Sequence, residues 1–408
     1  KVKPGLTGLA QVRGGDYLKP EEKIVYDVEY IKTFFETSPS AKDIMRECKT
    51  WDGMWSIIYL SPDGRMFCFT DPLGKKQLYL KNNEAETSPE WRYPEVCSEI
   101  FPLVHDFKDF DLQYKSSVFK WGYNTDNRTP WRNVFRIMPD QMFIFSPGLK
   151  IPFILGMGGK DFLTEHVENI NLEYALHEAV ERRLQYEKGK IGLMLSGGLD
   201  SSIIAAIACQ YKKDIEFLTI NNEDDLFYAK LMAEHLGVKL NISEYNPENL
   251  TDAQIAEYLK CNETPVDLGS MIPNQDMFAI IKPEVILSGD GSDELFGGYR
   301  RMDDYDSQYS DVFEELSFYH LPRLDKACRR YKKELLNPFL STDVIKSAFN
   351  VPYKERIHKE VLKTVFKNYL PKEILERPKL PLKNAQLKSN PLAWRKRLFD
   401  IFYNKINF

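Results

Sequence analysis

The sequence has few of the residues that mark metal-binding and disulfide-rich proteins. Its 408 residues include only six Cys and six His. No two Cys form a CxxC pair and no two His form an HxH or HxxxH pair. This argues against a zinc ribbon, a dense disulfide framework and a His-rich metal site. Widely spaced Cys residues fit a reducing compartment, and we expect a cytoplasmic protein.

Long apolar runs and a strong net charge are also missing. No uninterrupted apolar stretch approaches the roughly 20 residues that span a bilayer, so we expect no membrane contact. The opening residues KVKPGLTGLAQVRGG have no apolar core, which predicts no signal peptide. The net charge of −5, from 55 Lys and Arg against 60 Asp and Glu, argues against a nucleic-acid partner.

The chain has enough apolar residues to form more than one hydrophobic core. Hydrophobic residues make up 43% of the chain, and the length predicts about two to three domains. Short strand-like runs alternate with turns from about 50 to 146, and the Pro- and Gly-rich stretch 147–159 predicts a linker. The spacing of apolar residues over 163–188 predicts an amphipathic helix. Strands then alternate with helices, as in a parallel sheet, and the pattern after about 310 is mainly helical.

The strongest motif is a strand that runs into a Gly-rich loop and then into a helix. Residues 190–195 are an apolar run of strand length, 196–202 read SGGLDSS, and 203–209 are rich in Ala and Ile. A capped helix after a buried strand is the structural alternative. The pattern is also what a loop that holds a phosphate requires.

Each residue type in this loop has a use in binding phosphate. Gly197 and Gly198 have no Cβ, so backbone N–H groups can close around an anion. Ser201 and Ser202 open the helix, where unpaired N–H groups and the positive end of the dipole favour phosphate. Asp200 would repel a phosphate unless a cation lay between them. We therefore interpret Asp200 as a Mg²⁺ ligand.

The loop resembles the pyrophosphate loop of the N-type ATP pyrophosphatases, which cleave ATP between the α and β phosphates and adenylate an acceptor. The resemblance implies an α/β fold: a parallel-sheet domain of the adenine nucleotide alpha hydrolase type, with a helical C-terminal part. It also implies ATP and Mg²⁺ as cofactors. The residues expected to bind ATP are Leu195, Ser196, Gly197, Gly198, Asp200, Ser201, Ser202, Thr219, Ser288 and Gly289.

A second Gly-rich loop narrows the choice among these enzymes. Residues 285–299 read VILSGDGSDELFGGY and resemble the SGxGxDExFGGY signature of class B (glutamine-type) asparagine synthetases. Asp293 can complete the Mg²⁺ shell begun by Asp200, so these two residues are the expected metal ligands. By the resemblance, Asp290 is a catalytic residue, tied to forming the β-aspartyl adenylate and deprotonating the amine.

The segment 354–397 is basic, with 13 Lys and Arg against 4 Asp and Glu. Its charge alone leaves a solvated helical face and a contact with a polyanion equally open. Residues 357–371 resemble a family helix that carries a Lys gripping the departing pyrophosphate. On that register Lys359 is the second expected catalytic residue. Arg377 and Lys379 are the next candidates.

The resemblance divides the chain into three parts. Residues 160–408 are expected to be the asparagine synthetase domain. Residues 33–155 resemble the later half of the family's Ntn-type glutaminase domain, an α+β unit. The expected unit is degenerate, because no Cys precedes Cys48 and the RGPD and NGEIYN strings are missing. Residues 1–32 resemble the C-terminal signature of bacterial sugar phosphotransferases without that family's catalytic acidic residues, and their role is open.

The resemblance implies an ATP-dependent, amide-forming carbon–nitrogen ligase. It would make asparagine from aspartate through β-aspartyl-AMP, with ammonia and not glutamine as the nitrogen donor. A separate glutaminase and a second copy of the chain, in a homodimer, are candidate partners. Two alternatives stay open: an intramolecular amide ligase similar to β-lactam synthetases and lasso-peptide cyclases, and a non-catalytic homologue.

Overall fold

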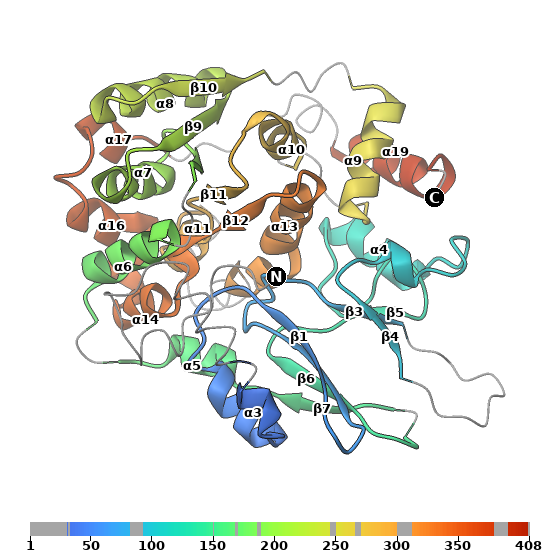
Figure 1. Ribbon diagram of the computed structural model, residues 1–408. Helices are drawn as coiled ribbons and strands as arrows, with labels where there is room; N and C mark the ends of the chain where they lie inside the picture. Colours follow the sequence, from blue (N-terminus) through green and yellow to red (C-terminus); the bar gives the residue numbers. More distant parts are fainter. Residues whose placement is uncertain are drawn as a thin grey trace.

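A computed structural model gives the structure of the protein (Figure 1). The predicted sugar-phosphotransferase-like segment 1–32 lies, apart from Ile31, outside the described residues. The structure describes residues 31, 33–81, 93–149, 151–167, 170–185, 189–244, 250–265, 271–299, 312–378 and 391–406.

The N-terminal part is built from two antiparallel sheets. One has the strand order β1-β2-β6-β7 and the other the order β4-β3-β5. Side chains of β2 and β6 pack against β3 between the sheets, and helix α3 (Ala41–Cys48) covers the other face of the larger sheet. The strands are β1 (Ser56–Leu60), β2 (Met66–Thr70), β3 (Tyr79–Lys81), β4 (Glu95–Cys97), β5 (Val134–Arg136), β6 (Gln141–Phe145) and β7 (Phe153–Gly156).

The predicted linker over 147–159 is wrong, because it contains strand β7. Gln141 of β6 lies opposite Gly156, and Ile144 lies opposite Phe153, in an antiparallel ladder. The Pro and Gly residues that suggested a linker flank an apolar run of strand length, and they mark the turns at its ends.

The C-terminal part is built on a parallel sheet with the order β10-β9-β8-β11-β12. Leu193 and Phe217 face helices α6, α7 and α8, whereas Leu218 and Ile286 face α10 and α13. Both faces are therefore buried, as parallel sheets require, and the predicted fold class is confirmed. The strands are β8 (Ile191–Met194), β9 (Ile215–Ile220), β10 (Leu240–Ser243), β11 (Val285–Leu287) and β12 (Glu334–Leu336).

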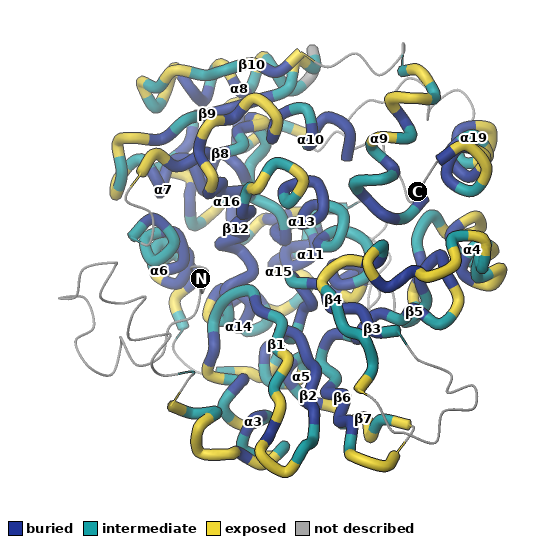
Figure 2. Tube along the Cα trace, turned by 45° about the vertical axis from the view of Figure 1, so that its right-hand side comes forward, coloured by how far each residue is buried: buried dark blue, intermediate teal, exposed yellow. Residues whose placement is uncertain are grey.

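Helices surround this sheet, and Figure 2 shows the buried stretches gathered at the centre of the molecule with exposed residues at its rim. None of the described helices is long and apolar enough to cross a bilayer. The longer helices are α4 (Leu112–Trp121), α6 (Leu172–Gln185), α7 (Leu199–Tyr211), α8 (Glu223–Leu236), α9 (Asp252–Asn262), α10 (Met271–Ile280), α13 (Leu321–Arg330), α14 (Thr342–Asn350) and α19 (Pro391–Asn404). The shorter ones are α5 (Gly159–Thr164), α11 (Ser292–Leu295), α15 (Tyr353–Arg356), α16 (Glu360–Val365) and α17 (Lys372–Leu375).

The single helix predicted over 163–188 is wrong at its start. Helix α5 ends at Thr164, and α6 begins at Leu172. The side chain of Asn171 accepts a hydrogen bond from the backbone N–H of Tyr174 at 3.0 Å, as a residue that caps a helix N-terminus does. An apolar period cannot by itself reveal such a cap.

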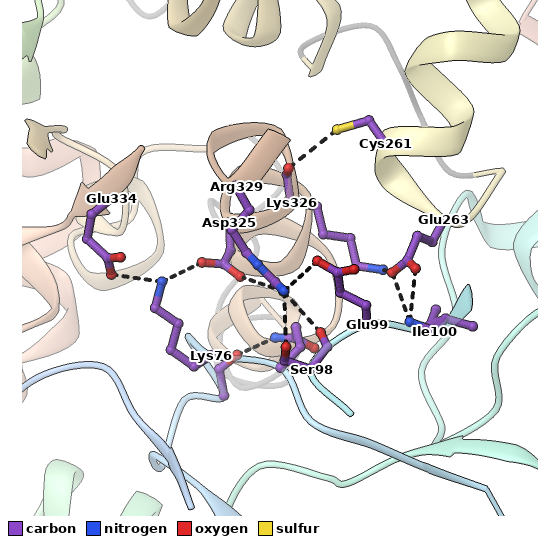
Figure 3. A network of polar contacts seen from close by, with 12 residues as sticks. Lys76, Ser98, Glu99, Ile100, Cys261, Glu263, Asp325, Lys326, Arg329 and Glu334 are labelled. Atoms are coloured by element: carbon purple, nitrogen blue, oxygen red, sulfur yellow. Dashed lines mark hydrogen bonds and ion pairs between the residues drawn. The ribbon is translucent and has the colours of Figure 1, made fainter. Parts of the chain in front are cut away.

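Poorly exposed ion pairs join helix α13 to the N-terminal part and to the C-terminal end of helix α9 (Figure 3). The ammonium of Lys76 lies 2.6 Å from Asp325 and 2.8 Å from Glu334. The ammonium of Lys326 lies 3.0 Å from the Glu263 carboxylate. Charges that leave water need such partners, because an unpaired buried charge costs several kcal/mol.

Glu263 connects three segments of the chain. Its carboxylate accepts hydrogen bonds from the backbone N–H groups of Ile100 at 3.0 Å and Phe101 at 2.9 Å, besides the one from Lys326. Burial raises the pKa of Glu263, but the Lys326 charge and these N–H groups outweigh it and hold the pKa below its ordinary value. The ionised carboxylate is therefore the form that stabilises the junction.

We predict that Glu263→Gln lowers the free energy of unfolding at pH 7 by about 3–5 kcal/mol, because Lys326 is left buried without its counter-charge. Since the folded-state pKa is lowered, this stabilisation is present above the unfolded pKa, about 4.3, and is lost as the pH falls through the folded-state value. Urea unfolding at a series of pH values measures both effects.

The matched control is Glu257→Gln. The Glu257 side chain is 57% exposed and pairs with Lys260 at the surface, so its loss should cost no more than about 1 kcal/mol. Equal costs for the two variants, or no change with pH in the difference between wild type and Glu263→Gln, would contradict the assigned role.

Candidate active site

The predicted phosphate loop lies between strand β8 and helix α7. The Leu195 N–H donates to the Leu218 carbonyl at 2.8 Å and extends the sheet by one residue into the loop. Gly198 caps α7 without any side-chain hydrogen bond, so the first N–H groups of the helix keep no side-chain partner there. The Ser202 hydroxyl is buried without a hydrogen-bond partner among the described atoms. An anion is the natural ligand of such a helix start.

Two glycines let the loops approach backbone to backbone. Gly197 has φ +68°, and a Cβ there would lie 2.3 Å from the Ala229 nitrogen. A Cβ on Gly289, in the second Gly-rich loop, would lie 2.8 Å from the Ser201 nitrogen. The two motifs that the sequence singled out are thus in contact.

Lys359 joins these two loops through charge. Its ammonium lies 2.6 and 2.8 Å from the two carboxylate oxygens of Asp200, and it also contacts Asp293. The Ser292 hydroxyl donates to Asp200 at 2.7 Å. A Cβ on Gly298 would meet the Lys359 Cε at 2.5 Å, so this contact also needs a glycine. The ammonium and the two predicted metal ligands share one small volume.

Lys359 ends a short 3-10 turn, Ile357–Lys359, and does not lie within an α-helix, so the predicted continuous helix over 357–371 is wrong there. His358 and Lys359 have φ values of +57° and +61°, and α16 begins only at Glu360. Their backbone N–H groups donate to the carbonyls of Gly297 and Phe296, both at 3.0 Å. Tertiary contacts therefore replace the first turn that the sequence pattern indicated.

One cavity of about 760 Å³ opens beside this cluster. All the predicted site residues line it except Gly197 and Ser202. Thr219 reaches it from β9, and Asp290 reaches it from the second loop, where its carboxylate accepts a hydrogen bond from the Ser288 hydroxyl. The volume is within the range of small-molecule sites.

Arg377 lies at this cavity but is bound to the protein. Its guanidinium donates to the Ser196 carbonyl at 3.0 Å, pairs with Asp225 and lies over the Tyr228 ring at 4.3 Å. It therefore holds the start of the phosphate loop at Ser196. Lys379, the other reserve candidate, lies outside the described residues.

A second polar cluster, not predicted from the sequence, lies in the cavity wall. The Tyr299 hydroxyl donates to Glu294 at 2.7 Å, and His320 lies 3.5 Å from the same carboxylate. Burial raises the pKa of Glu294 above its ordinary value. Glu294 and Tyr299 belong to the second motif, but His320 comes from beyond it, and only the fold brings it there.

The donor atoms at the site fit Mg²⁺ only if phosphate completes its shell. Among the described residues, no group of three or more His, Cys, Asp or Glu side chains could hold a metal. Asp200 and Asp293 offer carboxylate oxygens, and Mg²⁺ is commonly held by one or two carboxylates plus substrate phosphates. The N-terminus of α7, at the wall of the same cavity, fits those phosphates.

The sequence pattern of the asparagine synthase family matches residues 171–317 and 305–401, more than half of the chain. The chain belongs to the asparagine synthase family. The matched stretch contains both Gly-rich loops, the Lys359 segment and His320.

Individual relatives are similar over part of their length. A probable asparagine synthetase (glutamine-hydrolysing) of Acanthamoeba polyphaga mimivirus is 29% identical over 271 residues, which are 59% of this chain and 48% of that protein. The human asparagine synthetase (glutamine-hydrolysing) is 31% identical over 246 residues, which are 53% of this chain and 43% of that protein. The matches thus span about half the length of these relatives.

Among solved structures, an NH3-dependent NAD synthetase from Campylobacter jejuni is 14% identical and covers 58% of this chain and 96% of its own. The TM-score is 0.29, which is too low to establish a shared fold.

We predict that Gly197→Ala destabilises the protein more than Gly237→Ala. Both glycines have left-handed φ values, +68° and +65°, but a Cβ on Gly237 meets nothing within 4 Å. Gly237→Ala should cost about 1–2 kcal/mol for the backbone alone, and Gly197→Ala should cost more because the loop must move away from α8. Urea unfolding of both variants measures the difference, and equal losses would mean that the close approach is relaxed without cost.

Proposed function

We propose that the protein is an ATP-dependent ligase that forms an amide, with aspartate as the acid and asparagine as the product. The observation that carries the proposal is the Lys359 ammonium held by Asp200 and Asp293 at the end of the phosphate loop. A positive charge fixed where a pyrophosphate would leave stabilises the charge that develops in the transition state.

The proposed reaction has two steps. A carboxylate oxygen of aspartate forms a bond to the α-phosphorus of ATP, and the bond from that phosphorus to pyrophosphate breaks. Ammonia then forms a bond to the activated carbonyl carbon, AMP leaves with the bridging oxygen, and the nitrogen loses a proton. Mg²⁺ on Asp200 and Asp293 would neutralise phosphate charge.

We assign roles to the chain's own residues accordingly. The 196–202 loop would hold the phosphates, Thr219 at the end of β9 would flank the adenine, and Lys359 would attract the pyrophosphate. Asp290 is in the cavity wall and would take the proton from the attacking nitrogen. Residues 160–408 are the proposed synthetase unit.

The N-terminal part has a separate place in this proposal. Residues 33–155 are proposed to be glutaminase-like in fold, and their role is to support the synthetase unit through the ion pair of Lys76 with Asp325 on α13. Ammonia is the proposed nitrogen donor, supplied free or by a separate glutaminase.

Exchange of labelled pyrophosphate into ATP, with aspartate and Mg²⁺, tests the proposed chemistry. Exchange that depends on aspartate supports it. Exchange only with another acid would contradict aspartate as the substrate and favour an intramolecular amide ligase or a ligase for that acid. No exchange with any acid would favour a non-catalytic homologue. Succinate lacks the amine of aspartate, and asparagine lacks its side-chain carboxylate. Exchange measured with each of them shows which of these groups the site recognises.

We predict that this 408-residue chain forms asparagine with ammonium but not with glutamine. The chain offers no Cys before Cys48 to attack the glutamine amide. Asparagine and glutamate are both quantified after incubation with each donor. Glutamate released from glutamine above the rate without enzyme would contradict the prediction, and asparagine formed with ammonium is the positive control for the synthetase step.

We predict that Lys359→Ala lowers kcat about 10²–10³-fold while the affinity for ATP changes much less, because the lost contact acts on the leaving group in the transition state. Steady-state kinetics with ammonium and aspartate measure both constants.

Lys363→Ala is the matched control. Lys363 also lines the cavity, but its ammonium pairs with Glu360 at 2.6 Å and its side chain is 32% exposed. Its loss should therefore cost far less than that of Lys359. Equal, small effects at both positions would remove Lys359 from the proposed mechanism.

A further inference from the structure

A second cavity lies where the N-terminal sheets meet helix α13. Its volume is about 60 Å³. A cavity needs only about 10–15 Å³ to hold a water molecule, so this one has room for a particle of a few atoms. Its lining is rich in positive charge, with Arg128 and Arg136 from the N-terminal part and Arg323 and Lys326 from α13.

Arg136 is the cation in this wall whose charge is least compensated. The residue is only 7% exposed. Its Nη2 donates to the Ser317 carbonyl at 2.5 Å, its Nε has no hydrogen-bond partner, and no carboxylate pairs with it among the described residues. Burial lowers the pKa of Arg136 to about 10, which still leaves the guanidinium charged at pH 7.

The acidic groups nearby are already engaged. Glu263 pairs with Lys326 (Figure 3), and Asp126 pairs with Arg128. Asp71 attracts Arg136 at longer range, but its carboxylate accepts hydrogen bonds from four backbone N–H groups.

Arg323 adds a further positive charge without adding an acid. Its guanidinium lies over the Tyr319 ring at 4.5 Å and its Nη2 is 3.1 Å from Nδ1 of His320. The charged side chains of the described lining are thus four cations and one carboxylate, that of Asp126.

We propose that this cavity binds a small monovalent anion, a halide or a short carboxylate, that pairs with the Arg136 guanidinium. An anion there lies beside a guanidinium in the cavity wall and compensates its charge. The size of the cavity admits chloride, bromide or formate and rejects an anion such as gluconate. The proposal does not depend on the proposed ligase activity.

The test compares thermal unfolding midpoints at constant ionic strength and pH while sodium gluconate is replaced by sodium chloride or sodium formate. A ligand that binds only the folded protein raises the midpoint, and the rise grows with its concentration. We expect both small anions to raise the wild-type midpoint relative to gluconate. A rise with formate alone would assign the site to carboxylates, and a rise with chloride alone to halides.

Arg136→Met should abolish the difference between the small anions and gluconate. The control is Arg132→Met, whose side chain is 57% exposed and pairs with Asp109 at the surface, and which should keep the whole effect. Equal midpoints in chloride, formate and gluconate for the wild type, or an unchanged anion effect in Arg136→Met, would overturn the proposal.

A second measurement decides the question should Arg136→Met fail to fold. Crystals of the wild-type chain soaked in sodium bromide should give an anomalous scattering peak in this cavity, beside the Arg136 guanidinium. Soaking in bromide together with excess formate should weaken that peak if both anions share the site. Bromide peaks at the protein surface alone would overturn the proposal.

Discussion

The contact of one ammonium with two carboxylates is the constraint on which the candidate active site depends. Asp200 lies in the first turn of helix α7, Asp293 lies in helix α11, and Lys359 directly precedes α16. Without the Lys359 charge, two carboxylates would face each other in a poorly solvated place and repel. The same charge makes the loops compatible with a polyanion, because it offsets the acidic residues beside the helix N-terminus.

The backbone is shaped to permit this contact. Gly298 leaves room for the Lys359 side chain, and Gly289 lets the second loop rest on the first. Lys359 itself accepts a left-handed conformation that costs about 1–2 kcal/mol for a residue with a Cβ. Hydrogen bonds from this segment to Phe296 and Gly297, together with the ion pairs, offset that cost.

The N-terminal sheets are attached to this unit by charge as well as by apolar packing. Lys76 and Glu263 lie in different segments, yet both have their partners on or beside α13. Helix α13 thus links the junction to the active-site cavity. Its residue Arg323 lines both the active-site cavity and the smaller cavity at the junction. Helix α13 therefore connects the charged groups of the junction to the site of the proposed chemistry.

The sequence by itself determined the local elements whose signals are contiguous. Strand β8, the loop 196–202 and helix α7 follow from apolar length and Gly placement, as does the parallel sheet from alternating strands and helices. The sequence did not predict strand β7, the gap before α6 or the backbone at Lys359, because turn residues, a cap and long-range hydrogen bonds override local pattern there.

The tertiary structure alone decided which charges meet. Lys359 reaches Asp200, 159 residues away, and Lys326 reaches Glu263, 63 residues away. Arg136 lies in a cavity wall without a carboxylate partner among the described residues. The sequence around a charged residue does not reveal whether its side chain is solvated or buried. Its partner is set by the packing of distant segments, and no local spacing records that packing.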